Sequence, residues 1–181
     1  MFFLFFDKTY QMKRKRRNLM KDYLQECVQK LSLSVIDETV DAEPKVEASQ
    51  EEIKNVLNDL YVAVDNSEYI PQTPTEENPA LSDDFIFDTK DQNFVLKDLE
   101  EDNFVAKIKD ISKGAERRRQ KGLPQEYLYV FKYACKLMRR DAAIDESEDV
   151  LIYIKINNRK VPYKKVFIVS FHKNRPKNNK I

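Results

Sequence analysis

Apolar residues recur at helical spacing in two stretches of the N-terminal half. The clearer stretch predicts an amphipathic helix over residues 50–64, because its apolar positions lie three or four residues apart and form one stripe. Its members are Ile53, Val56, Leu57, Leu60, Tyr61 and Val64. Ser49 precedes the run and Glu52 lies three residues later, which is the spacing of a capping box. A second stripe, with a strongly basic start, predicts a helix over residues 10–31.

Prolines and acidic residues separate these helices from the rest of the chain. Residues 66–83 contain Pro71, Pro74 and Pro79 and no basic residue, which predicts an exposed, mobile linker. Residues 84–99 then alternate between apolar and acidic positions, which favours two short strands at 85–88 and 93–96.

The C-terminal part combines two helical patterns with a hairpin pattern. Spaced apolar residues predict helices over 103–121 and 125–140, separated by Gly122 and Pro124. A β-branched run at 150–156 and alternation at 161–171 predict two strands. Asn157 and Asn158 can adopt the positive φ that a tight hairpin turn needs.

Together these patterns predict an α+β protein, with N-terminal helices and a mobile acidic linker joined to a small C-terminal helix-helix-β-hairpin block. The expected parts are an N-terminal helical region at 1–65, an acidic proline-containing linker at 66–102, a basic α+β domain at 103–172 and a basic tail at 173–181. A block of about 70 residues buries a smaller share of its surface than a larger domain does, and is marginally stable alone. We therefore expect the N-terminal helices to pack on it, or the chain to form a homodimer.

The formal net charge of +1 conceals three blocks of opposite sign. Residues 1–30 carry a net +5, residues 31–106 a net −16 and residues 107–181 a net +12. Such segregation favours a polyanion as the partner of the basic block, with the acidic segment as a regulator. The alternative is that the blocks neutralise one another inside one fold.

Basic residues occur in every predicted element of the C-terminal block, so folding can gather them on one surface. We expect single-stranded RNA or DNA as the partner, because cations neutralise phosphates and exposed tyrosines such as Tyr127, Tyr129, Tyr133 or Tyr153 stack on bases. The candidate nucleic-acid-binding residues are Arg117, Arg118, Arg119, Lys121, Lys132, Lys136, Arg139, Arg140, Arg159, Lys160, Lys164, Lys165, Lys173 and Arg175.

A second basic cluster lies at the start of the predicted 10–31 helix. Five adjacent cations cannot all face a core, so most of them are solvated or neutralised by a partner. We interpret the cluster as a nuclear localisation signal or a nucleic-acid contact, with a solvated helix start as the alternative. It consists of Lys13, Arg14, Lys15, Arg16 and Arg17.

Little in the sequence supports catalysis. Two glycines exclude the Walker and dinucleotide fingerprints, and two cysteines exclude a four-cysteine zinc site. His172 is the single histidine, and with Lys173 and Arg175 it is a candidate for RNA cleavage. The run at 169–173 resembles a strand of compact ribosome-dependent toxins. We assign no catalytic residue, no metal site and no cofactor, and expect a non-enzymatic protein.

The compartment follows from the N-terminus and the cysteines. The apolar run at 1–6 stops at Asp7 and has no basic region before it, unlike a secretory signal. No stretch approaches the length of a membrane span. Cys27 and Cys135 fall in helix-like apolar patterns, so we expect reduced, buried thiols. These features favour an intracellular protein, cytoplasmic or nuclear and not secreted.

Two functions remain open at this level. The first is a nucleic-acid-binding accessory protein whose acidic arm competes with nucleic acid for the basic block. The second is a protein-interaction or inhibitor protein, such as a viral or mobile-element factor that modulates its host, acting through the acidic segment and the 50–64 helix. Exposed cations at 117–140 favour the first function, whereas pairing of these cations with carboxylates of 31–102 favours the second.

Overall fold

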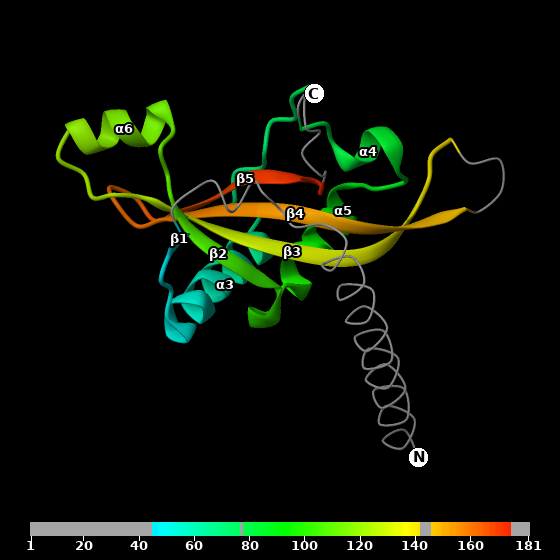
Figure 1. Cartoon of the computed structure of the whole chain (residues 1–181), viewed down its shortest axis with the longest axis horizontal. Coiled ribbons are helices and arrows are strands. Elements are labelled where there is room, and N and C mark those ends of the chain that lie inside the picture. The colour runs from blue at the N-terminus through cyan, green and yellow to red at the C-terminus, as the bar shows by residue number, and fades with distance from the viewer. Residues whose placement is uncertain (1–44, 77, 142–145, 175–181) are drawn as a thin grey trace, which may run out of the picture. The chain divides into compact units, whose positions relative to one another are not determined.

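The computed structural model describes residues 45–76, 78–141 and 146–174 (Figure 1). This part of the chain is an α+β structure with one five-stranded antiparallel sheet, four α-helices and one 3-10 helix, η1. The strands are β1 (Lys45–Val46), β2 (Phe104–Lys109), β3 (Tyr127–Met138), β4 (Ser147–Arg159) and β5 (Lys165–Lys173). The helices are α3 (Gln50–Asp65), α4 (Leu81–Asp84), α5 (Thr89–Asp98), η1 (Glu101–Asn103) and α6 (Lys113–Gln120).

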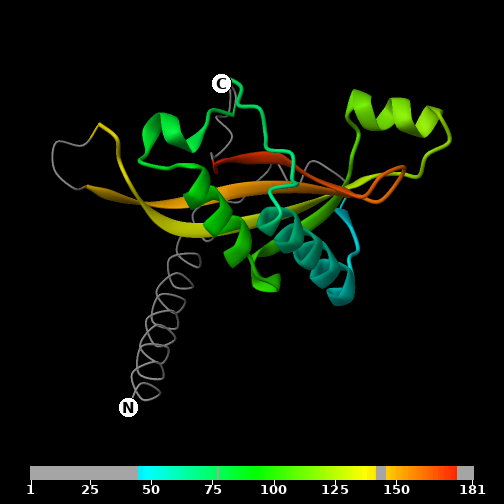
Figure 2. The same cartoon turned by 180° about the vertical axis from the view of Figure 1, so that it is seen from behind.

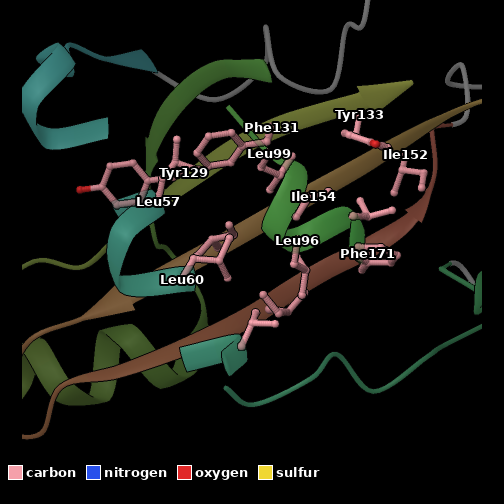
Figure 3. Packing of buried hydrophobic residues seen from close by; sticks show 14 of the residues in the cluster. Leu57, Leu60, Leu96, Leu99, Tyr129, Phe131, Tyr133, Ile152, Ile154 and Phe171 are labelled. Carbon is pink, nitrogen blue, oxygen red and sulfur yellow. The ribbon is translucent and has the colours of Figure 1, made fainter. Parts of the chain in front are cut away.

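The strands pair in chain order, so the sheet is a meander. Phe131 on β3 lies opposite Ile154 on β4, which lies opposite Phe171 on β5. Because strand side chains alternate between faces, these residues share one face of the sheet. Figure 2 shows α3 and α5 in front of this face, and Figure 3 shows Leu60 and Leu96 packed against it. The main core therefore lies between the sheet and the acidic helices.

The helix expected over 50–64 is confirmed, because α3 spans Gln50–Asp65. The Ser49 hydroxyl accepts a hydrogen bond from the amide of Glu52 at 3.1 Å, as the capping-box spacing requires. The apolar stripe of α3 is buried in the core. It is therefore already covered by the chain's own sheet.

The strands predicted at 85–88 and 93–96 are wrong as regular strands, although Phe85 forms an isolated bridge with Arg139. Residues 89–98 form α5 instead. The side chain of Asp88 accepts hydrogen bonds from the amides of Lys90 and Asp91, and Asp91 accepts one from the amide of Asp88. This reciprocal capping box fixes a helix where apolar–acidic alternation suggested a strand.

The segment predicted as an exposed linker runs along the outer edge of β5. Ile70 accepts a backbone hydrogen bond from Ile168 at 2.8 Å and donates one to Val166 at 2.9 Å. The side-chain oxygen of Gln72 accepts a hydrogen bond from the amide of Phe171. The segment therefore covers a sheet edge that would otherwise present unpaired backbone groups.

The two helices predicted in the C-terminal block are wrong for most of their length. Residues 104–109 form β2, and only Lys113–Gln120 is helical within the predicted 103–121 helix. The predicted 125–140 helix is the long strand β3. The hairpin is confirmed as β4 and β5, but its turn falls at 160–164, because Asn157 and Asn158 are paired inside β4.

Candidate nucleic-acid interface

Two connections meet at one end of the sheet. One runs from β2 through α6 to β3, and the other is the turn between β4 and β5 (Figure 1). We call residues 109–126 and 159–165 the basic end, since they contain ten Lys or Arg and three Asp or Glu. Eight of the predicted nucleic-acid-binding residues come together here: Arg117, Arg118, Arg119, Lys121, Arg159, Lys160, Lys164 and Lys165.

Short-range polar contacts set the start and end of α6. Asp110 accepts a hydrogen bond from the amide of Ser112 at 3.0 Å, and the Ser112 hydroxyl accepts one from the amide of Ala115 at 3.2 Å. Gly122 follows the helix with a φ of 78°, a conformation that glycine adopts without steric cost, as the sequence predicted. Ala115 is the single fully buried residue of α6. The helix therefore depends on polar contacts, more than on apolar packing, for its position on the sheet.

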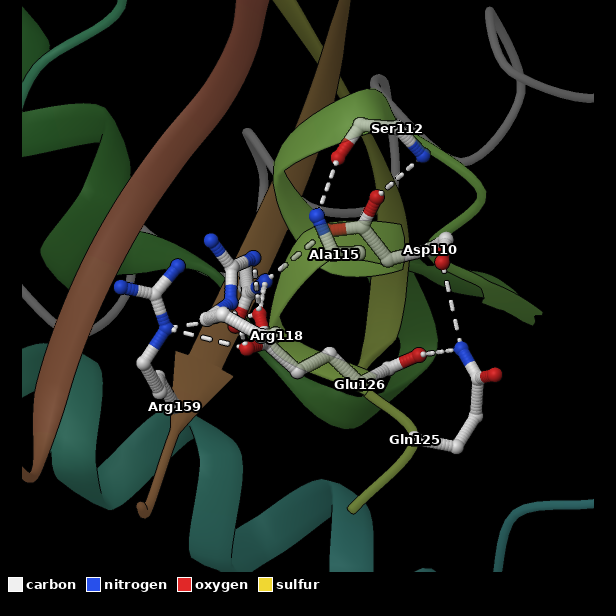
Figure 4. Close-up of polar contacts among 8 residues, drawn as sticks. Asp110, Ser112, Ala115, Arg118, Gln125, Glu126 and Arg159 are labelled. Atoms are coloured by element: carbon white, nitrogen blue, oxygen red, sulfur yellow. Dashed lines mark hydrogen bonds and ion pairs between the residues drawn. The ribbon is translucent and has the colours of Figure 1, made fainter. Parts of the chain in front are cut away.

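Those contacts converge on the carboxylate of Glu126 (Figure 4). Nη2 of Arg118 on α6 donates to Oε2 of Glu126 at 2.9 Å, and the side-chain amide of Asn157 on β4 donates to the same oxygen at 2.7 Å. Arg159 lies 3.3 Å from this carboxylate, and Asn157 also donates to Oδ2 of Asp110 at 3.2 Å. Burial raises the pKa of Glu126, but the hydrogen bonds from Arg118 and Asn157 outweigh it and lower the pKa overall. Glu126 is thus an anion that fastens α6 to the sheet.

A second carboxylate holds the turn between β4 and β5. Asp59 on α3 forms ion pairs with Lys160 and Lys164 and accepts a hydrogen bond from the side chain of Asn158 at 2.8 Å. Burial raises the pKa of Asp59, but hydrogen bonds from Asn158, Lys160 and Lys164 outweigh it and bring the pKa down to about 2. The turn is therefore fixed to the acidic helix.

Several cations of the basic end have no such partner. Five of them are exposed and make no ion pair within the described part of the chain: Lys109, Lys113, Arg117, Lys121 and Lys165. Tyr163 in the adjacent turn is 79% exposed. The sequence analysis did not include Lys109 and Lys113, because it predicted one continuous helix over 103–121. In the structure β2 ends at Lys109 and α6 begins at Lys113, which places both lysines at the basic end.

The remaining predicted cations lie elsewhere. Lys132 and Lys136 are in the middle and far half of β3. Arg139 pairs with Asp141 at 2.8 Å and Arg140 donates to the carbonyl of Ser82 at 3.0 Å, both at the opposite end of β3. Lys173, at the far end of β5, pairs with Glu148. Arg175 and the cluster Lys13, Arg14, Lys15, Arg16 and Arg17 lie outside the described residues.

The tyrosines expected to stack on bases are not exposed. Tyr129, Tyr133 and Tyr153 are buried, and Tyr127 is half-buried. The hydroxyl of Tyr129 donates to Glu52 at 2.6 Å and that of Tyr133 donates to Asp98 at 2.8 Å. The rings of Tyr127, Tyr129 and Tyr133 belong to the packing between sheet and helices. The ring of Tyr153 belongs to a second apolar cluster on the other face of the sheet, with Ala106, Ile108, Leu128 and Val130. The expectation is therefore wrong for these tyrosines.

The sequence left open whether the cations at 117–140 are exposed or paired with carboxylates of residues 31–102. In the structure some of them are exposed and others pair with carboxylates of their own block. Arg118, Arg119 and Arg139 pair with carboxylates of their own block, at positions 116–148. Arg117 is exposed and makes no ion pair with a described residue. The ion pairs of Arg118, Arg119 and Arg139 therefore use carboxylates of their own block, and the acidic segment contributes the nearby charge of Asp84 at Arg139.

His172 lies on β5, away from the basic end. Its ring packs against that of Tyr153, with centroids 5.4 Å apart, and its Nδ1 lies 3.0 Å from the carbonyl oxygen of Lys173. Within the described residues, no group of three or more His, Cys, Asp or Glu is placed to hold a metal ion. None of the helices described is both long and apolar enough to cross a membrane. Cys135 is half-buried, and Cys27 lies outside the described part.

Comparisons of the chain with protein families, with curated proteins and with solved structures found no match. The geometry alone therefore defines the class: an α+β domain with helices α3 and α5 on one face of a sheet and a concentration of cations at one end of it.

Proposed function

We propose that the basic end binds single-stranded nucleic acid, RNA or DNA, without chemical turnover. The observation that carries the proposal is the set of five exposed cations that make no ion pair with a described residue and come from the end of β2, from α6 and its C-cap, and from the start of β5. Cations on neighbouring elements can contact successive phosphates, and each contact releases counterions from the strand.

The exposed ring of Tyr163 supports a single strand over a duplex. The ring lies in the turn between Lys160 and Lys164, so a base stacked on it would have its phosphates near cations. Unpaired bases offer a free face for such stacking, whereas paired bases are already stacked on their neighbours.

In this proposal the acidic segment weakens nucleic-acid binding through the carboxylate of Asp59. Asp59 occupies Lys160 and Lys164, so a phosphate at the turn competes with its carboxylate. Deleting residues 37–100 is unsuitable as a test, because it would remove the core residues of α3 and α5. The substitution Asp59→Asn removes the competing charge and leaves the core intact, and we expect it to tighten binding.

Fluorescence anisotropy of the full chain tests the proposal. The probes are single-stranded RNA, single-stranded DNA and duplex DNA of equal length, each titrated at several salt concentrations. We expect single strands to bind best, with an affinity that falls steeply as salt rises. Replacing Lys113, Arg117 or Lys121 by Gln should each weaken binding and reduce the salt slope by about 0.7 per lost contact.

Lys90→Gln is the matched control, since Lys90 is an exposed cation on α5, away from the basic end. It should leave affinity and slope unchanged. Absence of binding to every probe at low salt would overturn the proposal, as would an equal loss in the Lys90→Gln control.

A protein partner is the second candidate, and one observation favours it. Val62 on α3 is 57% exposed and Phe94 on the neighbouring α5 is 62% exposed. Helix α3 carries four carboxylates and one lysine, whereas α5 carries two of each charge. An acidic surface with exposed apolar side chains suits a basic protein partner. In that case the variants of α6 would have no effect, and Phe94→Ser would weaken the complex.

A further inference from the structure

A cavity of about 460 Å³ lies beneath α6 at the basic end. Its apolar lining comes from Leu128 on β3, Phe167 and Val169 on β5, and Ile111 before α6. Lys109, Arg118 and Arg159 line it as well. The cavity thus combines an apolar interior with cations, next to the exposed lysines of α6.

The apolar groups of this cavity are unusually accessible. Ile111 is 77% exposed and Val169 is 42% exposed, although both are large aliphatic side chains. Phe167 is half-buried, and the guanidinium of Arg159 lies 4.1 Å from the centre of its ring. A planar cation stacked on an aromatic ring, flanked by aliphatic side chains, presents surfaces that suit a flat heterocycle.

We infer that this cavity receives a nucleobase of the strand bound at the basic end. The inference rests on the proposed function and adds where a base, as distinct from a phosphate, makes its contacts. The base packs against Ile111, Phe167 and Val169, while the exposed Lys109 at the rim neutralises an adjoining phosphate. Base packing of this kind supplies affinity that does not depend on salt.

Charge distinguishes this cavity from the other large one at the same end of the sheet. A cavity of about 450 Å³ on the α3 side is lined by three carboxylates, Glu51, Glu52 and Glu126, and by two cations, Arg159 and Lys160. Carboxylates outnumber cations in this lining, so it is less favourable to a strand of phosphates than the cavity beneath α6. The lining of the cavity beneath α6 contains one carboxylate, Asp110, and three cations.

The test compares two oligonucleotides with the same number of phosphates, an oligothymidylate and its abasic counterpart. Anisotropy titrations of the wild-type chain should show about tenfold tighter binding of the base-bearing strand. This factor corresponds to the free energy that one stacked base contributes to binding. Ile111→Ser and Phe167→Leu should each reduce this preference severalfold, and the part that remains is the stacking of a base on Tyr163, which both variants retain. Both variants should bind the abasic strand as the wild type does, with the same salt slope.

Two controls keep the experiment decisive. Phe94→Leu removes an exposed aromatic ring on α5 and should leave the preference unchanged. Ile111→Ser changes a side chain that is 77% exposed, so it tests the cavity even if Phe167→Leu lowers stability. Equal binding of both strands by the wild type would overturn the inference, and the stacking on Tyr163 with it, but would leave phosphate binding by the exposed cations standing. Absence of binding to either strand would overturn both.

Discussion

Arg118 on α6 and Glu126 just before β3 form a two-point ion pair, in which Nη2 of the arginine lies 2.9 Å from Oε2 of the glutamate. The pair joins the two ends of the loop that reverses the chain between α6 and the sheet. Since α6 buries only Ala115 fully, this contact and those of Asn157 and Arg159 position the exposed cations of the helix. The positions of these cations therefore depend on the carboxylate of Glu126, although its negative charge is the same as that of a phosphate.

The substitution Glu126→Gln should loosen α6. It leaves Arg118 and Arg159 without their common anion in a half-buried site, and we expect a loss of about 2 kcal/mol in the free energy of unfolding. Denaturant unfolding measures this loss, and amide exchange should rise first in residues 113–120.

Glu116→Gln is the control for that change. Glu116 pairs with Arg119 one turn away on the exposed surface of α6, and such pairs contribute at most about 1 kcal/mol. An equal loss in the two variants would contradict a special role for Glu126.

Asp59 gives the fold a pH dependence of known sign. Its pKa is about 2 in the folded chain, below the ordinary value of 3.8, so its contribution is fully present above about pH 5 and is lost as the pH falls toward 2. We expect Asp59→Asn to lower stability by about 1 kcal/mol at pH 7, since the paired lysines are exposed. The difference between wild type and variant should vanish near pH 2 in urea unfolding curves. A difference that stays constant from pH 7 to pH 2 would show that Asp59 acts through packing alone.

Two of the elements that sequence patterns recovered, α3 and β5, have one apolar and one polar face, whereas β4 was recovered from its run of β-branched residues. Helix α3 has a single stripe and a capping box, and β5 alternates, so both were predictable. Strand β3 is buried on both faces, with Phe131 toward the helices and Val130 toward the second apolar cluster. A strand of this kind has no alternation, and its apolar residues also fit helical spacing. The tyrosines and valine at 127–133 were the signal for a strand.

The candidate site was predictable in its charge but not in its geometry. Lys121 and Lys165 are far apart in sequence, and only the order of strands in the sheet brings their elements to one end. Capping at Asp110 and Ser112 starts α6 and so determines where its cations lie. The cavity beneath α6 could not be predicted at all, because it requires Ile111 and Phe167 to come together across separate elements.

Cys135 should be a slow nucleophile. Burial raises the pKa of its thiol from 9.0 to about 12, so the thiolate fraction at pH 8 falls roughly a thousandfold. In a Cys27→Ser variant, where Cys135 is the remaining thiol, alkylation of the native chain should be slower than that of the unfolded chain by about this factor. Equal rates in the native and unfolded chains would contradict the burial of the thiol.

Residues 66–102, expected from their sequence to be an acidic linker, should behave as part of the folded domain. Leu96 on α5 is fully buried against the sheet, so Leu96→Ala should cost about 2–5 kcal/mol in the free energy of unfolding. Val62→Ala is the control, because Val62 is 57% exposed on the neighbouring helix α3 and its truncation should change stability by less than about 0.5 kcal/mol. Denaturant unfolding followed by far-UV circular dichroism measures both. A mobile linker at 66–102 would instead make Leu96→Ala as mild as Val62→Ala, and the packing of α5 on the sheet would then be wrong.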